Sequence, residues 1–340
     1  MDISSERLSS EQLLDWLRSQ LGAALSYATE PVRLTGGFDT VTMAFRLADA
    51  PEGLGGELIL RVLPPAAPIV RLRREVATHE ALVGAGFPAP RIFLHEENAG
   101  LLGGPFIVME RLAGETMWAA AMGPRGDRRR LLTLPRRLAA AHALLHSIEG
   151  KHLAASAQSH GIDPTLLTVA GELGRIRGRI AKAGLIGLLP GIDWLERNLR
   201  RPQESEVVCH GDFHPLNIMV AGDRLTGVID WPQAIAAEPA FDVACTLVLL
   251  RFADAGFAGP LRTLFELARA MLVRRYLAAY RAARPFRDAN IAYYEALRVL
   301  SALVAAGEYP PGPRNPWHKP RVLAALYRHF EAVSGVKVEV

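Results

Sequence analysis

The sequence predicts an α+β protein in two parts: a small N-terminal part with an antiparallel sheet and a helix, and a larger, mostly helical C-terminal part. Short β-like segments separated by Gly and Pro dominate roughly the first 110 residues. Beyond Thr116 the chain changes to long stretches of Ala, Leu and Arg with helical periodicity. We therefore expect domains at 1–112 and 113–340, and a chain of 340 residues suits about two domains.

The N-terminal part should begin with a helix and continue as a sheet. Apolar positions at three- and four-residue spacing follow Ser10, a suitable N-cap, and predict an amphipathic helix over 11–27. Three strands are expected next, in the segments VRLTGG, TVTMAFRLA and ELILRVLPP. A helix in RLRREVATHEALVGAG should end at Gly84 or Gly86, and two more strands should follow in PAPRIFLHEE and GPFIVMERL.

The C-terminal part should contain helices at 129–148 and 165–184 and three more between 240 and 332. One β-rich segment, 206–231, interrupts them, and within it NIMV and LTGVID flank the hairpin-like turn AGDR. The segment ERLAGE, 110–115, lies where strand-rich sequence becomes helix-rich, and we expect the hinge between the two parts there.

The composition excludes several classes of protein. Because 50% of the residues are apolar and 22% are charged, the chain is not of the disordered class. A net charge of +4 with scattered basic residues indicates no nucleic-acid partner. No apolar run is long enough to cross a bilayer, and the N-terminus is polar and acidic, so we expect no membrane association and a cytoplasmic location. Cys209 and Cys245 are too few for a disulfide framework, which fits a reducing compartment.

The densest cluster of polar residues lies in the β-rich segment, and one interpretation of it is a metal-dependent hydrolase. His210, Asp212 and His214 occupy alternate positions, so on a strand they would face one way and offer two imidazoles and a carboxylate to a zinc-like ion. Gly211 and Pro215 instead favour a loop, and no further histidine cluster follows to complete a two-metal site. The hydrolase is therefore the weaker alternative.

The other interpretation is phosphoryl transfer, in which the protein mainly positions the reactants and neutralises charge. Such a site needs an acidic residue to accept the proton of the attacking hydroxyl, and an Asn and a second Asp to hold Mg²⁺ on the triphosphate. Asp212 and Asn217 have the spacing of the kinase catalytic loop H-R-D-x-x-x-x-N, with His210 and Gly211 in the first two places. Asp230 ends the next expected strand, where the metal-binding Asp of D-F-G would lie.

Two motifs, HGDFHPLNIMV at 210–220 and GVIDWPQAIAAEPAFDVA at 227–244, occur together in this chain. With them the chain resembles the aminoglycoside phosphotransferase and choline kinase-like family of small-molecule kinases, and the resemblance spans most of the chain. The resemblance implies a two-lobed protein-kinase-like fold. It also implies Mg²⁺-dependent transfer of a γ-phosphoryl group from ATP, or alternatively GTP, to a hydroxyl of a small-molecule substrate.

The resemblance assigns roles to residues at matching motif positions. By it, Asp212 is the catalytic base, Asn217 and Asp230 are the Mg²⁺ ligands, and Asp242 is the buried acid that steadies the catalytic loop. The segment LLHSI is also typical of the family, and we interpret its histidine, His146, as structural.

Nucleotide-binding candidates lie upstream. The segment TGGFDTVTMAFRL resembles the family's glycine turn, in which Gly36 and Gly37 would place backbone amides over the phosphates. The segment VMERLAGE matches the family's interlobe hinge, so the C=O of Glu110 and the N–H of Leu112 are expected to bind adenine.

The phosphate-binding cation departs from the family pattern. Glu75 matches the helix glutamate that pairs with this cation, which is normally a lysine on the third strand. Here that strand reads ELILRVL and offers Arg61, and no lysine precedes Lys151. Arginine keeps the charge and can fork onto phosphate oxygens or onto Glu75, but it is longer and planar. A catalytically degenerate protein that only binds nucleotide is therefore an alternative function.

The acceptor is expected to be neutral or anionic. Residues 251–340, where substrate residues of the family lie, contain 14 Lys and Arg against 7 Asp and Glu. A polycationic aminoglycoside would need an acidic pocket, so this balance argues against such a substrate. The sequence leaves the identity of the acceptor and the oligomeric state open.

Overall fold

The computed structural model describes residues 3–340 apart from 23, 35–39, 255, 257–258 and 310–314. The chain divides into two compact units. The first unit comprises residues up to Gly114 together with 226–232, and the second comprises 115–225 and 233–340. The segment 226–232, which was expected in the C-terminal domain, thus belongs with the first unit.

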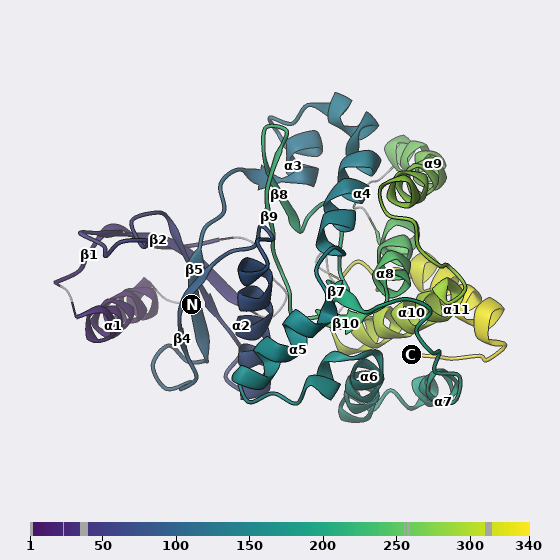
Figure 1. Cartoon of the computed structure of the whole chain (residues 1–340), viewed down its shortest axis with the longest axis horizontal. Coiled ribbons are helices and arrows are strands. Elements are labelled where there is room, and N and C mark those ends of the chain that lie inside the picture. The colour runs from purple at the N-terminus through teal and green to yellow at the C-terminus, as the bar shows by residue number, and fades with distance from the viewer. Residues whose placement is uncertain (1–2, 23, 35–39, 255, 257–258, 310–314) are drawn as a thin grey trace. The chain divides into compact units, whose positions relative to one another are not determined.

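The first unit is a five-stranded antiparallel sheet with two helices (Figure 1). The order of the strands is β1-β2-β3-β5-β4. Strands β2 to β5 lie in the predicted segments, whereas β1 begins earlier than predicted and shares only Val32 and Arg33 with the segment VRLTGG. Its elements are α1 (Ile3–Leu21), β1 (Ser26–Arg33), β2 (Val41–Ala48), β3 (Leu58–Val62), α2 (Ile69–Gly84), β4 (Ile92–Glu96) and β5 (Phe106–Glu110).

The first helix ends earlier than the sequence predicted. Helix α1 ends at Leu21, and Gly22 has a φ of 64°, a left-handed conformation that suits glycine after a helix. Strand β1 then begins at Ser26, where both Ser26 and Tyr27 pair with β2. The prediction of helix up to residue 27 was therefore wrong, because strand pairing and not apolar spacing determines the conformation of these residues.

Alternate side chains of β3 pack on opposite faces of the sheet. Leu58, Leu60 and Val62 pack into the same cluster as residues of α1, whereas Ile59 packs with residues of α2. Successive side chains of a strand point to opposite faces, so Arg61 shares the face of Ile59 and is directed toward α2.

The second unit is mostly helical, with short strands between its helices (Figure 1). Its first half contains β6 (Glu115–Thr116), α3 (Met117–Met122), η1 (Arg128–Leu132), α4 (Leu134–Leu145), α5 (Gly150–Ser159), η2 (Pro164–Leu167), α6 (Val169–Ala183), η3 (Ile186–Leu188) and α7 (Leu189–Arg197). Its second half contains β7 (Val207–Cys209), β8 (Ile218–Ala221), the start of β9 (Arg224–Val228), β10 (Ile235–Ala237), α8 (Pro239–Phe252), α9 (Gly259–Ala283), α10 (Ile291–Glu308) and α11 (Pro320–Ser334).

The helices of this unit are more divided than predicted. The stretch 129–148 forms η1 and α4 rather than one helix, because Pro135 lacks an N–H and favours the first turn of a new helix. The stretch 165–184 forms η2 and α6, which ends at Ala183 and is followed by Gly184 with a φ of 68°. Four helices, α8 to α11, lie where three were expected, and α3, α5 and α7 were not predicted.

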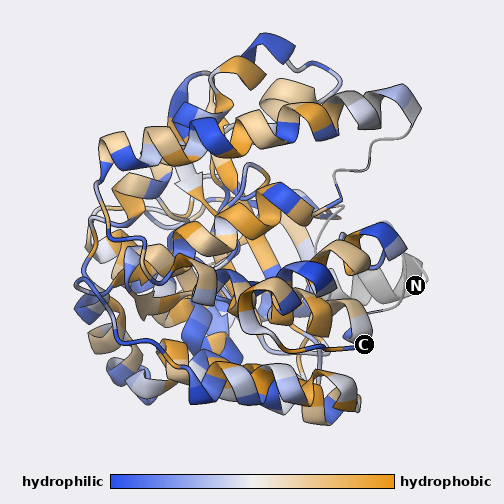
Figure 2. Cartoon of the chain, turned by 90° about the vertical axis from the view of Figure 1, so that its right-hand side faces the viewer, coloured by the Kyte–Doolittle hydropathy of each residue, from blue (hydrophilic) through white to orange (hydrophobic). Residues whose placement is uncertain are grey.

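Helix α10 lies in the main core of the second unit. It contacts α6, α7, α8 and α11, and its residues from Tyr293 to Val304 are all buried. In Figure 2 the helices of the second unit show orange apolar residues interspersed with blue polar ones. None of the helices in the described chain combines the length and apolar character that a membrane span requires.

Candidate active site

A loop between β7 and β8 carries the predicted base. Residues 210–217 form this loop and not a strand, as Gly211 and Pro215 predicted. Gly211 has a φ of 76°, and a Cβ atom there would lie 2.9 Å from the carbonyl oxygen of Gln233. Both the backbone conformation and the available space therefore require glycine next to Asp212.

The carboxylate of Asp242 holds the start of this loop. The backbone N–H of His210 donates to its Oδ2 at 2.6 Å, and the N–H of Gly211 donates to its Oδ1 at 2.8 Å. Asp242 is fully buried in the first turn of α8, and the hydroxyl of Thr246, one turn later, donates to the C=O of Phe213 at 2.9 Å. Two residues of one helix thus bind the backbone of the loop at three points.

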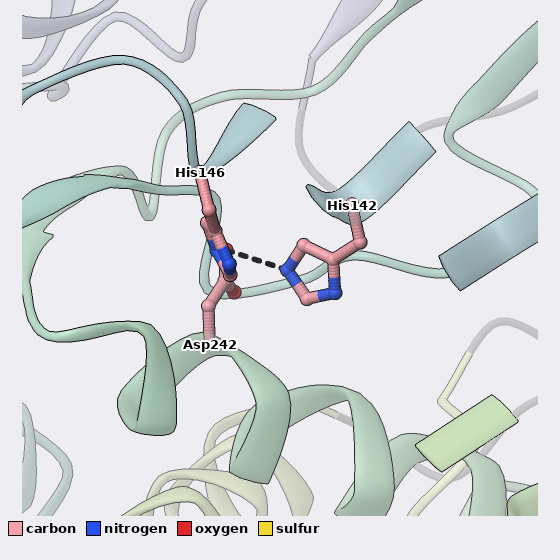
Figure 3. A group of neighbouring side chains, drawn as sticks. All are labelled: His142, His146 and Asp242. Carbon is pink, nitrogen blue, oxygen red and sulfur yellow. Dashed lines mark hydrogen bonds and ion pairs between the residues drawn. The ribbon is translucent and has the colours of Figure 1, made fainter. Parts of the chain in front are cut away.

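Two histidines complete the surroundings of Asp242 (Figure 3). Nε2 of His142 and Nε2 of His146 lie 3.1 and 3.2 Å from Asp242 Oδ2. On their other sides, the Nδ1 atoms lie 2.7 Å from the hydroxyl of Tyr276 and 2.5 Å from that of Tyr280. His142, His146 and Asp242 each offer one ligand atom, and these three atoms lie within 4.8 Å of one another. The cluster could therefore hold a metal ion.

The surroundings of Asp242 and His146 determine whether each side chain is charged. Burial raises the pKa of Asp242, but His142 and His146 outweigh it and hold the pKa well below its ordinary value. Burial and the neighbouring His142 lower the pKa of His146 to about 4. At neutral pH His146 is therefore uncharged, and it can donate from Nε2 to Asp242 while Nδ1 accepts from Tyr280. A neutral histidine on a carboxylate that already binds two loop N–H groups supports its predicted structural role.

Asp212, the predicted base, has three side chains around its carboxylate. Arg298 Nη2 donates to Oδ1 at 2.6 Å, and His214 Nε2 lies 3.3 Å from Oδ2. Asn217 Nδ2 donates to the backbone oxygen of Asp212 at 3.1 Å and lies 3.4 Å from Oδ2. Burial raises the pKa of Asp212, but His214, Arg298 and His210 outweigh it, so the pKa lies below its ordinary value. The carboxylate is therefore ionised at neutral pH and able to accept a proton.

The hydrolase interpretation required His210, Asp212 and His214 to face one way. In the loop, His210 Nδ1 accepts instead from the backbone N–H of Asp212 at 3.2 Å. Among the described residues, the group identified as able to hold a metal is His142, His146 and Asp242.

Arg61, Glu75 and Asp230 lie together in the first unit. Arg61 Nη1 donates to Glu75 Oε1 at 2.7 Å, and Arg61 Nη2 donates to Asp230 Oδ1 at 3.1 Å. Glu75 lies on α2 and is fully buried, whereas the side chain of Asp230 is 45% exposed. The predicted pairing of Arg61 with Glu75 is present in the structure, and the same guanidinium also contacts the predicted Mg²⁺ ligand.

Asp230 has an uncommon backbone conformation. It follows the end of β9 at Val228 by two residues, rather than ending the strand as predicted, and its φ is 70°. Next to it, Trp231 is fully buried, donates from Nε1 to the C=O of Val228 at 2.9 Å, and meets the ring of Phe87 edge-on. The buried indole holds this turn, so Asp230 is presented from a fixed backbone.

The other nucleotide-binding candidates are partly described. Glu110 is the last residue of β5, and its N–H donates to the C=O of Arg91 at 2.9 Å. Leu112 follows and lies against Gly227, where a Cβ atom would come within 2.5 Å of its side chain. Gly36 and Gly37 lie outside the described residues.

Sequence reasoning missed two residues of the site, Arg298 and His142. Arg298 is a buried arginine within the apolar stretch LRVLSALVAA of α10. An isolated charge in such an apolar stretch needs a partner when it is buried. This requirement is the signal that could have identified Arg298. His142 lies one helical turn before His146, which directly follows the last residue of α4, and this four-residue spacing is the signal that the two imidazoles lie on the same side.

Comparison with known proteins places the site in context. Residues 33–314 match the family model described as "Phosphotransferase enzyme family". The curated acyl-CoA dehydrogenase family member 11 of Rattus norvegicus is 26% identical over 196 residues, which cover 55% of this chain and 24% of the relative. Acyl-CoA dehydrogenase family member 10 of Mus musculus is 26% identical over 242 residues, covering 69% and 22%. The chain thus spans about a quarter of the length of these curated relatives.

Solved structures cover nearly the whole chain. A Ralstonia eutropha protein assigned as an aminoglycoside phosphotransferase has a TM-score of 0.60 and 18% identity, covering 96% of this chain and 98% of that one. The macrolide 2′-phosphotransferase of Brachybacterium faecium has a TM-score of 0.53 and 20% identity, covering 96% and 97%. An aminoglycoside phosphotransferase solved with ADP and hygromycin B has a TM-score of 0.53 and 15% identity, covering 94% and 95%. These likenesses confirm the predicted kinase-like fold.

Proposed function

Because the chain belongs to the phosphotransferase enzyme family, we propose that it transfers the γ-phosphoryl group of ATP to a hydroxyl group of a small molecule in the presence of Mg²⁺. The observation that carries this proposal is the ionised carboxylate of Asp212 on a loop whose backbone Asp242 binds at His210 and Gly211. A general base has to be deprotonated and fixed in position before the acceptor arrives, and this loop meets both requirements.

Asp212 acts as the base in this proposal. The acceptor oxygen forms a bond to the γ-phosphorus, the bond from that phosphorus to the bridging oxygen breaks, and ADP leaves with the electron pair. The proton of the acceptor hydroxyl passes to Asp212. Either oxygen of the Asp212 carboxylate can take this proton. The hydrogen bond from Asn217 goes to the backbone oxygen of Asp212, so it holds the loop in its conformation while the carboxylate is protonated.

Asn217 and Asp230 would hold Mg²⁺, which neutralises charge on the triphosphate when bound. The Asn217 side chain donates through Nδ2 to Asp212, which leaves its carbonyl oxygen Oδ1 outside these hydrogen bonds. Asp230 uses Oδ1 for Arg61, which leaves Oδ2 outside that ion pair. Mg²⁺ prefers oxygen ligands, so the atoms that these residues leave available fit the cation.

The nucleotide would be bound mainly by the first unit. Arg61, oriented by the buried Glu75, would contact phosphate oxygens, as would the backbone amides of Gly36 and Gly37. The C=O of Glu110 and the N–H of Leu112 would bind adenine. In support, a structural relative holds ADP.

One observation favours a second candidate, a protein that binds nucleotide without turnover. Arg61 stands where the family has lysine, and its two terminal nitrogens contact Glu75 and Asp230. An arginine that keeps both carboxylates would compete with Mg²⁺ for Asp230. Nucleotide binding without phosphoryl transfer would then result.

A thermal-shift titration with ATP and with GTP, each with and without Mg²⁺, tests nucleotide binding. At a hundredfold excess over Kd, binding should stabilise the protein by about 2.7 kcal/mol. The wild-type protein and Asp212→Asn should both show the Mg²⁺-dependent shift, because Asp212 is not a nucleotide ligand. Absence of any nucleotide shift would contradict the proposal, and a shift with Zn²⁺ alone would favour the hydrolase.

Turnover separates the two candidates. Product ADP and the phosphorylated acceptor, measured by mass spectrometry over a panel of alcohols, should appear with wild-type protein and vanish with Asp212→Asn. The matched control is Asp223→Asn, whose side chain is 90% exposed in the turn after β8. Equal turnover in wild type and Asp212→Asn would remove Asp212 as the base, and a nucleotide shift without turnover of any acceptor would favour the non-catalytic alternative.

A further inference from the structure

The contact between Arg298 and Asp212 bears on which acceptors the site admits. Arg298 lies on α10, and its side chain is 8% exposed. Its Nη2 donates to Asp212 Oδ1 at 2.6 Å, and its guanidinium carbon lies 5.8 Å from the centre of the Trp317 ring. All three residues belong to the second unit, so the relation is internal to one compact part of the chain.

Not all N–H groups of the Arg298 guanidinium form good hydrogen bonds within the protein. Its Nη1 reaches Gln233 Oε1 at a long 3.4 Å, and its buried Nε has no hydrogen-bond partner among the residues that the structure describes. Arginine presents five N–H donors in a planar fork that matches a carboxylate, and an unsatisfied buried donor is costly. A bound anion could therefore replace the long contact of Nη1 with a stronger hydrogen bond.

The base carboxylate is occupied on both oxygens. Oδ1 accepts from Arg298, while Oδ2 lies near His214 and Asn217. A hydroxyl that approaches Oδ1 competes with the guanidinium, which would lose its only carboxylate partner among the described residues. An acceptor that brings its own anionic group compensates this loss, because Arg298 can shift its hydrogen bonds to that group.

We propose that Arg298 selects acceptors that carry a carboxylate close to the reacting hydroxyl. This inference rests on the proposed function and names its substrate class. With hydrogen bonds of ordinary length to both residues, the hydroxyl oxygen and the nearest carboxylate oxygen are at most about 8 Å apart, which suits a short hydroxy acid. The carboxylate of the acceptor forms no covalent bond in the reaction, and only the hydroxyl oxygen attacks phosphorus.

The same arginine disfavours cationic acceptors. An ammonium group placed near Asp212 would lie within a few ångströms of a buried guanidinium, and like charges in a site of low dielectric repel. The excess of basic residues in 251–340 acts in the same direction. Arg298 and the basic surroundings therefore both favour an anion.

Matched acceptors test this inference. Lactate, its neutral amide lactamide and its cationic analogue isopropanolamine present a similar hydroxyl with different charge, and glycolate and β-hydroxybutyrate with their amides extend the series. With saturating Mg·ATP, kcat/KM for the hydroxy acids should exceed that of their amides by about tenfold or more, as expected for one charged hydrogen bond. Isopropanolamine should be the poorest acceptor. Equal or better use of lactamide or isopropanolamine would overturn the inference.

Variants assign the preference to Arg298. Arg298→Gln should remove the preference: because Arg298 also contacts Asp212, both acceptors are affected, but kcat/KM for the acid should fall by more than kcat/KM for its amide, so that their ratio approaches one. Arg298→Lys keeps one positive charge, so it should keep a reduced preference in the same direction if Arg298→Gln does not fold. The matched control is Arg179→Gln, because Arg179 pairs with Glu308 at the far end of α10 at 2.6 Å. An unchanged preference in both Arg298 variants would overturn the inference.

Failure of the inference can be told apart from failure of the proposed function. If Mg·ATP stabilises the protein and the hydroxy acids react no faster than their amides, the inference is wrong while the nucleotide site stands. If Mg·ATP gives no shift and no acceptor is phosphorylated, the proposed function itself is wrong and the inference falls with it.

Discussion

The carboxylate of Asp242 accepts the backbone N–H of His210 at 2.6 Å, although the two residues are 32 positions apart in the sequence. Asp242 lies in the first turn of α8 and His210 starts the loop that carries Asp212. A buried carboxylate thereby determines the conformation of the loop two residues before the proposed base. The first three predictions concern this relationship.

Asp242→Asn should strongly destabilise the second unit. The N–H groups of His210 and Gly211 bind different oxygens of Asp242, and in an amide an NH₂ group, which cannot accept, would replace one of these oxygens. We expect a loss of about 3 to 5 kcal/mol in the free energy of unfolding, as for a broken buried charge interaction. Urea unfolding measures this loss. Asp288→Asn, whose carboxylate pairs with Arg281 at the surface, should change stability by at most about 1 kcal/mol.

His146 should make stability depend on pH. Its pKa is about 4 in the folded protein, below the ordinary 6.5, so protons bind the unfolded chain more tightly. The contribution of neutral His146 to the free energy of unfolding is therefore complete above pH 6.5. It is lost as the pH falls to about 4, and the loss amounts to about 3 kcal/mol. Unfolding free energies measured across this range should decline less for His146→Gln. The exposed His152 is the control, and His152→Gln should keep the wild-type slope.

Gly211→Ala should be far more harmful than Gly222→Ala. Both glycines have a positive φ, 76° and 61°, but only at Gly211 would the new Cβ atom meet backbone, the carbonyl oxygen of Gln233 at 2.9 Å. Gly222→Ala should cost about 1 kcal/mol from backbone strain alone, and Gly211→Ala about 3 kcal/mol or more. Thermal unfolding compares the two. Equal losses would show that the loop can move away from Gln233.

Removing Arg61 should leave Glu75 as an uncompensated buried charge. We expect Arg61→Met to cost about 3 to 5 kcal/mol, and the double variant Arg61→Met/Glu75→Met to recover much of this. The surface pair Arg73 and Glu97 is the control, where Arg73→Met should cost at most about 1 kcal/mol. A double-mutant cycle of unfolding free energies without coupling between Arg61 and Glu75 would contradict the pairing.

Local patterns predicted most of the first unit. The alternation of ELILRVL and of the segments around it, with Gly and Pro between them, was enough to find β2 to β5, and Gly211 and Pro215 were enough to predict a loop around Asp212. Strand β1 was placed too late, since only Val32 and Arg33 of VRLTGG lie in it. The helix predicted up to residue 27 failed because residues 26 and 27 pair with β2. Helices α3, α5 and α7 were missed because each is short, from six to ten residues, so few turns are available to show a period.

The sequence by itself determined the chemistry that is local along the chain: the acidic residue, the amide and the glycine of the loop 210–217, whose spacing is maintained by covalent connection. Only the tertiary structure decided which distant groups control that chemistry. Arg298 reaches Asp212 across 86 positions, and His142 reaches Asp242 from another helix. No local pattern encodes such contacts, because they exist only when helix packing brings buried charges together, and burial is what makes each of them require its partner.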